Sequence, residues 1–77
     1  MSKPKVTLTK RKIGHRLYNA RSFSNMTMKE VAEKIGVRYS TVWGWENGIS
    51  IPRVDNLIKL SRLYEVSIDY ILKGGGL

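Results

Sequence analysis

The sequence predicts an all-α fold for one small domain. Apolar residues recur three and four positions apart through most of the chain, which is the spacing of one face of a helix. Start and stop signals, namely a Thr27-x-x-Glu30 pair and the glycines Gly36 and Gly48, divide that pattern into short helices. The sequence contains no long alternation of apolar and polar residues, so signals for a sheet are missing.

The first helix is expected over about residues 10–22. Ile13, Leu17 and Ala20 lie at positions i, i+4 and i+7 and form its apolar stripe. Basic residues precede it, and Pro4 favours an extended backbone at the residue before it. We therefore expect residues 1–8 to form a flexible basic arm. The folded domain is then expected over residues 9–73 and a glycine-rich tail over residues 74–77.

The second helix has the clearest start signal in the chain. Thr27 and Glu30 are spaced as a capping box, in which each side chain bonds the backbone N–H of the other residue. Met26 and Val31 are spaced as the hydrophobic staple that often accompanies such a box. These signals predict a short helix over residues 28–35, which the following glycine ends.

The helical pattern resumes four residues after Gly36. Val42 and Trp45 are expected to point inward from this third helix, and Asn47-Gly48 is expected to end it. Two short helices joined by a tight glycine turn are typical of a helix-turn-helix.

A fourth helix is expected just after Pro52, and Ser67 is placed to cap a last helix over about residues 68–72. The fourth helix has an apolar stripe at Leu57, Leu60, Ser61 and Tyr64. The complete prediction is a five-helix domain.

The charge of the chain is strongly positive. It carries 14 basic and 6 acidic residues, which gives a net charge of +8 at neutral pH in a chain of 77 residues. Residues 1–12 hold five of the basic side chains and no acidic one, so this segment carries +5 and the remainder +3. Such an excess favours a polyanionic partner, with nucleic acid ahead of an anionic membrane surface.

Catalytic and metal-binding motifs are missing from the sequence. There is no cysteine, and the single histidine, His15, falls on the polar side of its helix and is interpreted as a surface residue. No nucleophile elbow or phosphate-binding glycine loop is present, so we expect no enzyme activity, metal or cofactor. No apolar run approaches the roughly 20 residues of a membrane span, and the basic N-terminus lacks the apolar stretch of a signal peptide. A cytoplasmic protein is therefore expected.

The pattern of residues resembles the Cro/CI-type, or XRE-type, helix-turn-helix domain over about 60 residues. The Trp45-Glu46-Asn47-Gly48 segment at its distance from Gly36 is the most specific part of the match. The other matching segments are Ile13-Gly14, Arg16-Leu17, Ala20-Arg21, Met26-Thr27, Glu30-Val31-Ala32, Ile35-Gly36-Val37, Ser40-Thr41-Val42, Pro52, Leu57, Leu60, Val66-Ser67 and Asp69-Tyr70-Ile71-Leu72.

The resemblance implies a compact, lambda-repressor-like fold that binds a double-stranded DNA operator, usually as a homodimer, and regulates transcription, here as a repressor. In such a fold the third helix, about residues 39–47, enters the major groove. It also implies a structural ion pair between Arg21 and Glu46 that orients this helix.

Two sets of DNA contacts are expected from this arrangement. The expected base-contacting residues lie on the outward face and at the start of the third helix: Arg38, Tyr39, Ser40, Trp43 and Gly44. The expected phosphate-contacting residues lie in the third helix, at the start of the second, after the third and in the basic segment: Met28, Lys29, Thr41, Asn47, Arg53, Lys10, Arg11 and Lys12.

Three departures from the family pattern affect the expected operator sequence. Met28 stands where the family usually has Gln, Arg38 where it usually has Ser, and Trp43-Gly44 where small or polar residues are common. No Gln or Asn occurs in residues 39–44, so we expect thymine methyl contacts and DNA shape to contribute much of the specificity.

Alternatives to specific DNA binding remain open from sequence alone. The fold could serve as a protein-interaction module, such as an antitoxin or the partner of an anti-repressor, or as a non-specific nucleic-acid binder. Trp43 could contact DNA, a second subunit or its own domain. The candidate dimer surface is the C-terminal region together with the loop after the third helix: Ile68, Ile71, Leu72, Leu77, Ile49 and Ile51.

Overall fold

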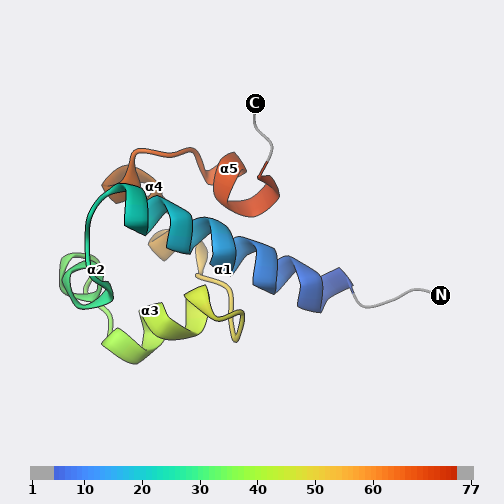
Figure 1. Cartoon of the computed structure of the whole chain (residues 1–77), viewed down its shortest axis with the longest axis horizontal. Coiled ribbons are helices and arrows are strands. Elements are labelled where there is room, and N and C mark those ends of the chain that lie inside the picture. The colour runs from blue at the N-terminus through green and yellow to red at the C-terminus, as the bar shows by residue number, and fades with distance from the viewer. Residues whose placement is uncertain (1–4, 75–77) are drawn as a thin grey trace.

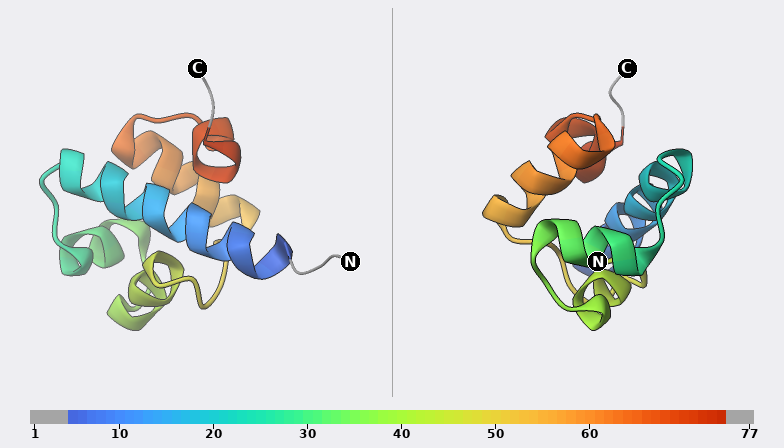
Figure 2. Two further views of the ribbon diagram at one scale, coloured as in Figure 1. Left: turned by 45° about the vertical axis from the view of Figure 1, so that its right-hand side comes forward. Right: turned by 90° about the vertical axis from the view of Figure 1, so that its left-hand side faces the viewer.

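Five α-helices and no strand make up the part of the chain that the computed structural model describes, residues 5–74. In chain order the helices are α1 (Lys5–Phe23), α2 (Met28–Ile35), α3 (Tyr39–Glu46), α4 (Val54–Tyr64) and α5 (Ile68–Lys73). The long α1 crosses the molecule and packs against α3 on one side and α5 on the other (Figures 1 and 2). Helix α2 packs against α3, and α4 packs against α2 and α5 on the side away from α1 (Figure 2). The all-α, five-helix prediction is confirmed.

Helix α1 begins earlier than the sequence pattern indicated. Its backbone is helical from Lys5 to Phe23, so the expectation of an extended arm is wrong for residues 5–8. Residues 1–4, the rest of the expected arm, lie outside the described residues. The apolar stripe does not mark this start, because only Val6 of the five added residues, 5–9, continues it. Lysine and threonine occur both inside and outside helices, so they do not indicate where a helix begins.

The turn between α2 and α3 follows the predicted signals. The Thr27 hydroxyl accepts a hydrogen bond from the Glu30 N–H at 3.0 Å, and the Glu30 carboxylate accepts one from the Thr27 N–H at 2.8 Å. Gly36 has a φ of +87°, a left-handed conformation that favours glycine, and its N–H closes α2 on the carbonyl of Ala32. Both boundaries of α2 agree with the prediction.

A side-chain cap begins α5, and two long-range hydrogen bonds join α5 and α4 to other helices. The Ser67 hydroxyl accepts a hydrogen bond from the N–H of Tyr70 and so caps α5, as expected. The Arg16 guanidinium donates to the carbonyl of Ile71, which joins α1 to α5. The Lys59 ammonium donates to the carbonyl of Ile35 and so joins α4 to the end of α2.

The hydrophobic core lies where all five helices meet. Val42 and Trp45 point into it as predicted, with 1% and 4% of their surfaces exposed. Ile71 is completely buried in the same core, so its assignment to a dimer surface is wrong, and Leu77 lies outside the described residues. The buried set is Ile13, Leu17, Ala20, Val31, Ala32, Ile35, Val42, Trp45, Leu57, Leu60, Tyr64 and Ile71.

Candidate nucleic-acid interface

The start of α2 presents free backbone donors on the surface. The capping box occupies the N–H groups of Thr27 and Glu30, while those of Met28 and Lys29 bond to no described residue. The Lys29 side chain is exposed, whereas Met28 is half-buried against the core. This helix end therefore offers two N–H groups, the positive end of the helix dipole and one ammonium group, which is a suitable arrangement for a phosphate.

Helix α3 has one buried face and one exposed aromatic face. Tyr39 and Trp43 lie four residues apart and leave 52% and 45% of their surfaces exposed, and Ser40 is exposed between them. Val42 and Trp45 anchor the opposite face in the core. The exposed side chains can contact the edges and methyl groups of bases.

Gly44 is not part of this exposed face. It is buried beneath the loop that follows α3, and a Cβ atom added to it would lie 3.7 Å from the Ser50 hydroxyl and 3.8 Å from the Ile49 Cβ. The expectation that Gly44 lies on the DNA-facing surface is therefore wrong. The physical reason is the helical period, because five residues place it about 140° around the helix from Tyr39.

Polar side chains surround both ends of α3. Arg38 is exposed at the N-cap, where its side chain makes no capping hydrogen bond, and Thr41 is half-buried one turn later. Asn47 is exposed at the other end and donates from its side-chain amide to the carbonyl of Trp43 at 2.9 Å. Arg53 is exposed where α4 begins. All four side chains therefore lie at least partly exposed in α3, at its ends or at the start of α4.

Three consecutive basic residues, Lys10, Arg11 and Lys12, lie in the first half of α1. Arg11 and Lys12 are exposed, and Lys10 is half-buried. Arg11 packs against the turn after α3, since a Cβ atom added to Gly48 would lie 3.2 Å from its Cγ. Arg11 is thereby placed beside the end of α3.

An ion pair ties α3 to α1. The Arg21 guanidinium donates to both carboxylate oxygens of Glu46, at 2.7 and 3.0 Å, and to the carbonyl of Met26 at 2.9 Å. The two side chains leave only 14% and 6% of their surfaces exposed. The hydrogen bond to Glu46 raises the pKa of Arg21 above its ordinary value. The structure therefore brings together the two residues that the resemblance pairs.

Sequence reasoning missed a groove between α1 and the end of α3. It has a volume of about 440 Å³, and His15 and Tyr18 form part of its wall together with Arg11, Met28 and Asn47. The rings of His15 and Tyr18 stack with centroids 6.5 Å apart, and the Arg21 guanidinium lies 5.5 Å from the centre of the Tyr18 ring. The helical spacing of Arg11, His15 and Tyr18 places them on one face of α1, and that spacing was the available signal.

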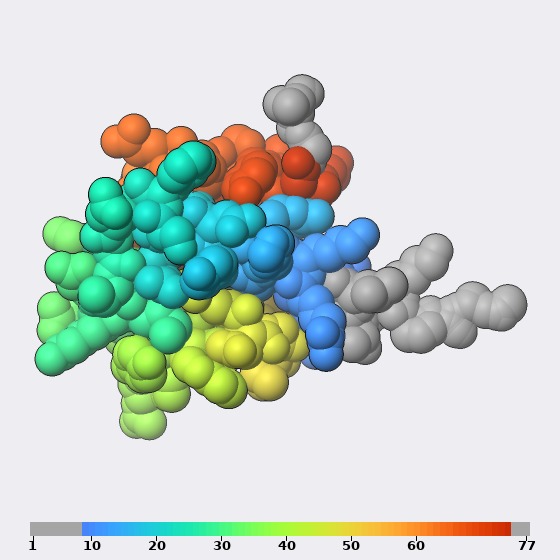
Figure 3. All heavy atoms as spheres, viewed as in Figure 1, coloured from blue at the N-terminus to red at the C-terminus, as the bar shows by residue number. Residues whose placement is uncertain are grey.

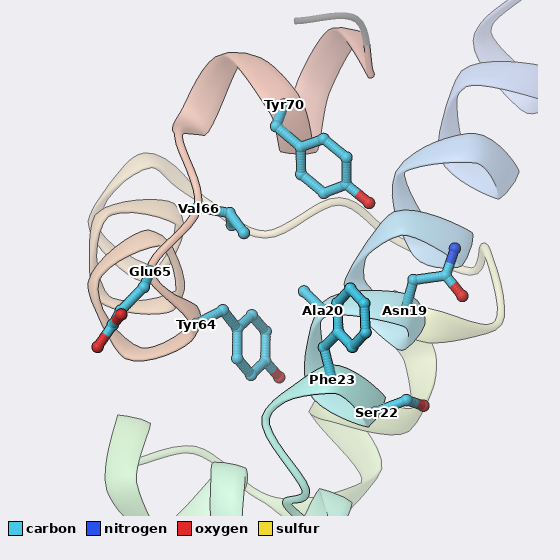
Figure 4. A pocket seen from close by; sticks show the side chains of 8 residues that line it. All are labelled: Asn19, Ala20, Ser22, Phe23, Tyr64, Glu65, Val66 and Tyr70. Carbon is cyan, nitrogen blue, oxygen red and sulfur yellow. The ribbon is translucent and has the colours of Figure 1, made fainter. Parts of the chain in front are cut away.

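A larger cavity, of about 740 Å³, lies between the later parts of α1 and α4 and the start of α5. Phe23, Tyr64 and Tyr70 gather around it, whereas the Glu65 carboxylate points away (Figure 4). Burial, reinforced by the charge of Glu46, raises the pKa of Tyr64 above its ordinary value. None of the side chains named above for α3 lines this cavity.

Two further features are missing from residues 5–74. None of the helices there is both long enough and apolar enough to cross a membrane. No three histidine or acidic side chains in the same range are grouped so that they could hold a metal ion.

Comparisons with known proteins agree with this geometry. The model of the family described as "Helix-turn-helix" matches residues 24–71. The uncharacterised HTH-type transcriptional regulator YobD of Bacillus subtilis (strain 168) is 46% identical over 57 residues, which are 74% of this chain and 51% of YobD. ImmR, an HTH-type transcriptional regulator of the same strain, is 42% identical over 60 residues, which are 78% of this chain and 47% of ImmR.

A phage regulator and a solved complex extend the comparison. The cryptic phage CTXphi transcriptional repressor RstR of Vibrio cholerae is 36% identical over 58 residues, 75% of this chain and 52% of RstR. The P22 c2 repressor, solved in complex with a synthetic operator, superposes with a TM-score of 0.78 at 28% identity. That superposition covers 82% of this chain and 96% of the P22 chain.

The matches cover most of this chain but only part of each curated relative. The chain spans about half the length of the curated relatives that it matches. The family model covers the helices α2 to α4 and most of α5, while YobD and the solved repressor match 74% and 82% of this chain. The chain therefore belongs to the helix-turn-helix family and contains a DNA-binding domain of the Cro/CI type found in transcriptional regulators.

Proposed function

We propose that this chain is a sequence-specific transcriptional repressor that binds double-stranded operator DNA in the cytoplasm and inserts α3 into the major groove. The observation that carries the proposal is the exposed Tyr39–Trp43 face of a helix whose opposite face is anchored in the core. The P22 c2 repressor, which has a similar fold, was solved on an operator. The major groove admits one α-helix, which is what this exposed face belongs to.

Base reading is assigned to Arg38, Tyr39, Ser40 and Trp43. Arg38 is the only one of these side chains that can bond two acceptors of a guanine at once. The aromatic rings are suited to the methyl group of thymine, and Ser40 can bond several bases. Specificity then depends on thymine methyl groups and on DNA shape more than on bidentate hydrogen bonds.

Phosphate contacts are assigned to the groups around this face. The N–H groups of Met28 and Lys29 bond one phosphate at the start of α2. The side chains that hold the neighbouring phosphates come from α3, from the segment after it and from α1: Thr41, Asn47, Arg53, Lys10, Arg11 and Lys12. These contacts fix the register of the domain on the duplex without reading its sequence.

Selection of binding sites from random duplex DNA tests the proposal. We expect a common sequence of two related half-sites, and a duplex with that sequence should bind at least about a hundredfold more tightly than a scrambled one. Replacement of thymine by uracil in one half-site removes only the methyl group, and it should weaken wild-type binding while affecting the Tyr39→Ala variant less. If Arg38→Ala, Tyr39→Ala and Ser40→Ala all leave the relative affinities for altered operators unchanged, α3 is not the reading element.

We further propose that the chain binds its operator as a homodimer. Four exposed apolar residues follow α3 in the chain, in the connecting loop and the first turns of α4: Ile49, Ile51, Val54 and Ile58. Ile49 and Val54 leave 62% and 71% of their surfaces exposed, which suits an interface that a second subunit covers. A two-fold axis through this apolar loop surface would place both α3 helices beside it, as two half-sites require.

A further inference from the structure

The groove between α1 and the end of α3 has a charge distribution that favours an anion. Arg21 and Glu46 contribute opposite charges to its wall, and these are paired with each other through two hydrogen bonds. Arg11 is left as an exposed cation at the same groove, and no residue in the described range 9–74 bonds its guanidinium. The groove therefore carries one uncompensated positive charge.

The groups that line the groove are restricted before any ligand binds. The stem of Arg11 packs against the turn at Gly48, where an added Cβ atom would lie 3.2 Å from its Cγ. The His15 ring stacks on Tyr18, which itself lies against the Arg21 guanidinium. Side chains held in this way lose less conformational entropy on binding a ligand than free surface side chains do.

The groove also adjoins the proposed path of the DNA. Met28, whose N–H group is assigned to a phosphate, lines it on one side, and Asn47 lines it at the end of α3. In the space-filling view, the early turns of α1 lie against the segment that follows α3 (Figure 3). A DNA strand that crosses the start of α2 and the end of α3 therefore passes over the groove.

We infer that this groove is a binding subsite for a DNA backbone phosphate, held by the guanidinium of Arg11 and an imidazole N–H of His15. The inference rests on the proposed function and deepens it, because it places the Arg11 contact in a defined groove and adds His15 as a second donor to the same phosphate. Arg11 supplies the charge, His15 supplies a donor, and Tyr18 is a positioning residue that holds the imidazole ring.

Fluorescence anisotropy titrations of the selected operator and a scrambled duplex, each at several KCl concentrations, test the subsite. The Arg11→Ala variant should bind both duplexes about ten times more weakly than wild type. The slope of log affinity against log salt should become less steep by about one, as expected for one lost phosphate contact. Arg11→Lys should restore the slope, because it restores the charge.

The His15→Ala variant should weaken binding of both duplexes by a similar factor, about three- to tenfold, as the loss of one hydrogen bond implies. His15→Gln, which retains an N–H donor, should recover part of that loss. Arg62→Ala is the matched control, because it removes one exposed cation from α4 and changes the net charge as Arg11→Ala does. It should change affinity less than about twofold and leave the slope unaltered.

The outcomes separate the subsite from the function itself. If wild type prefers its operator but Arg11→Ala and His15→Ala bind no more weakly than Arg62→Ala, the subsite is refuted and the proposed function stands. If wild type shows no preference for any selected duplex, the proposed function fails, while the salt slopes still decide whether Arg11 holds a phosphate. Thermal unfolding of each variant checks that affinity losses do not arise from unfolding. Because Arg11 and His15 are exposed, both alanine variants should stay folded.

Discussion

The Arg21 guanidinium holds the Glu46 carboxylate by two hydrogen bonds, of 2.7 and 3.0 Å, between the last turn of the longest helix and the last residue of α3. Glu46 is nearly fully buried, and Arg21 also caps the carbonyl of Met26 just before α2. One guanidinium thus connects α1, the approach to α2 and the end of α3. The pair fixes where the candidate reading helix lies relative to the rest of the domain.

Breaking this pair should cost far more than an exposed ion pair would. Arg21→Ala and Glu46→Ala should each lower the free energy of unfolding by about 3 kcal/mol, because each leaves the other charge buried without a partner. The double variant should lose clearly less than the sum, with a coupling energy of about 1–3 kcal/mol. Urea unfolding of the four proteins measures the cycle. Additive losses would mean that the two side chains act independently despite their hydrogen bonds.

Two helical glycines should respond to alanine in opposite directions. A Cβ atom at Gly14 would lie 2.5 Å from the carbonyl oxygen of Trp45 and 2.8 Å from that of Glu46, so Gly14→Ala must push α1 away from α3. We expect a loss of about 3 kcal/mol in the free energy of unfolding. At Gly44 the nearest atoms would be at ordinary contact distances, and Gly44→Ala should stabilise the fold by about 0.5–1 kcal/mol. Thermal or urea unfolding of both variants provides the comparison, and equal effects would show that the close approach at Gly14 is not what limits this position.

These glycines also show how far the sequence could predict the molecule. Gly36 ends α2 in the sequence and in the structure, because a local signal, a left-handed helix stop, dictates it. The capping box of Thr27 and Glu30 was predictable for the same reason. Nothing local distinguishes Gly14 from any other helical glycine, because the constraint on it comes from α3, about thirty residues away in the chain.

The candidate site was predictable to a similar extent. The period of α3 placed Val42 and Trp45 inward and Tyr39 and Trp43 outward, and the structure agrees. The outward assignment of Gly44 is wrong, because the helical period turns it about 140° from Tyr39, toward the loop that covers it. The spacing of Arg11, His15 and Tyr18 predicts a shared face of α1 but not the groove itself, which arises from packing α1 against the end of α3.

Alkaline pH should destabilise the domain through Tyr64. Burial raises its pKa in the folded state, whereas the unfolded chain ionises near the ordinary value of about 10. The unfolded state therefore loses a proton that the folded state keeps, and the stability present below about pH 10 is lost as the pH rises above it. Between about pH 9 and pH 11 the free energy of unfolding should fall more steeply for wild type than for Tyr64→Phe. Parallel curves from urea titrations at these pH values would contradict a shifted Tyr64.

The apolar loop surface gives a test of dimerisation that leaves the fold and the charge unchanged. The Ile49→Ser/Val54→Ser variant removes two exposed apolar side chains per subunit, and serine is acceptable at the start of α4. Its free energy of unfolding should stay within about 0.5 kcal/mol of wild type. Dimerisation should weaken by at least about tenfold, because each lost apolar contact is worth about 1 kcal/mol or more. Sedimentation of the protein with a two-half-site duplex measures the stoichiometry.

Phe23→Ser is the control for this variant, because it also replaces an exposed apolar side chain with serine. Phe23 is 93% exposed and ends α1, far in the chain from the apolar loop surface. It should leave two subunits on each duplex, whereas the Ile49→Ser/Val54→Ser variant should occupy the half-sites one at a time. Two subunits binding together in both variants would place the interface elsewhere. A loss in Phe23→Ser alone would direct attention to the cavity beside Tyr64 and Tyr70 as the surface where subunits meet.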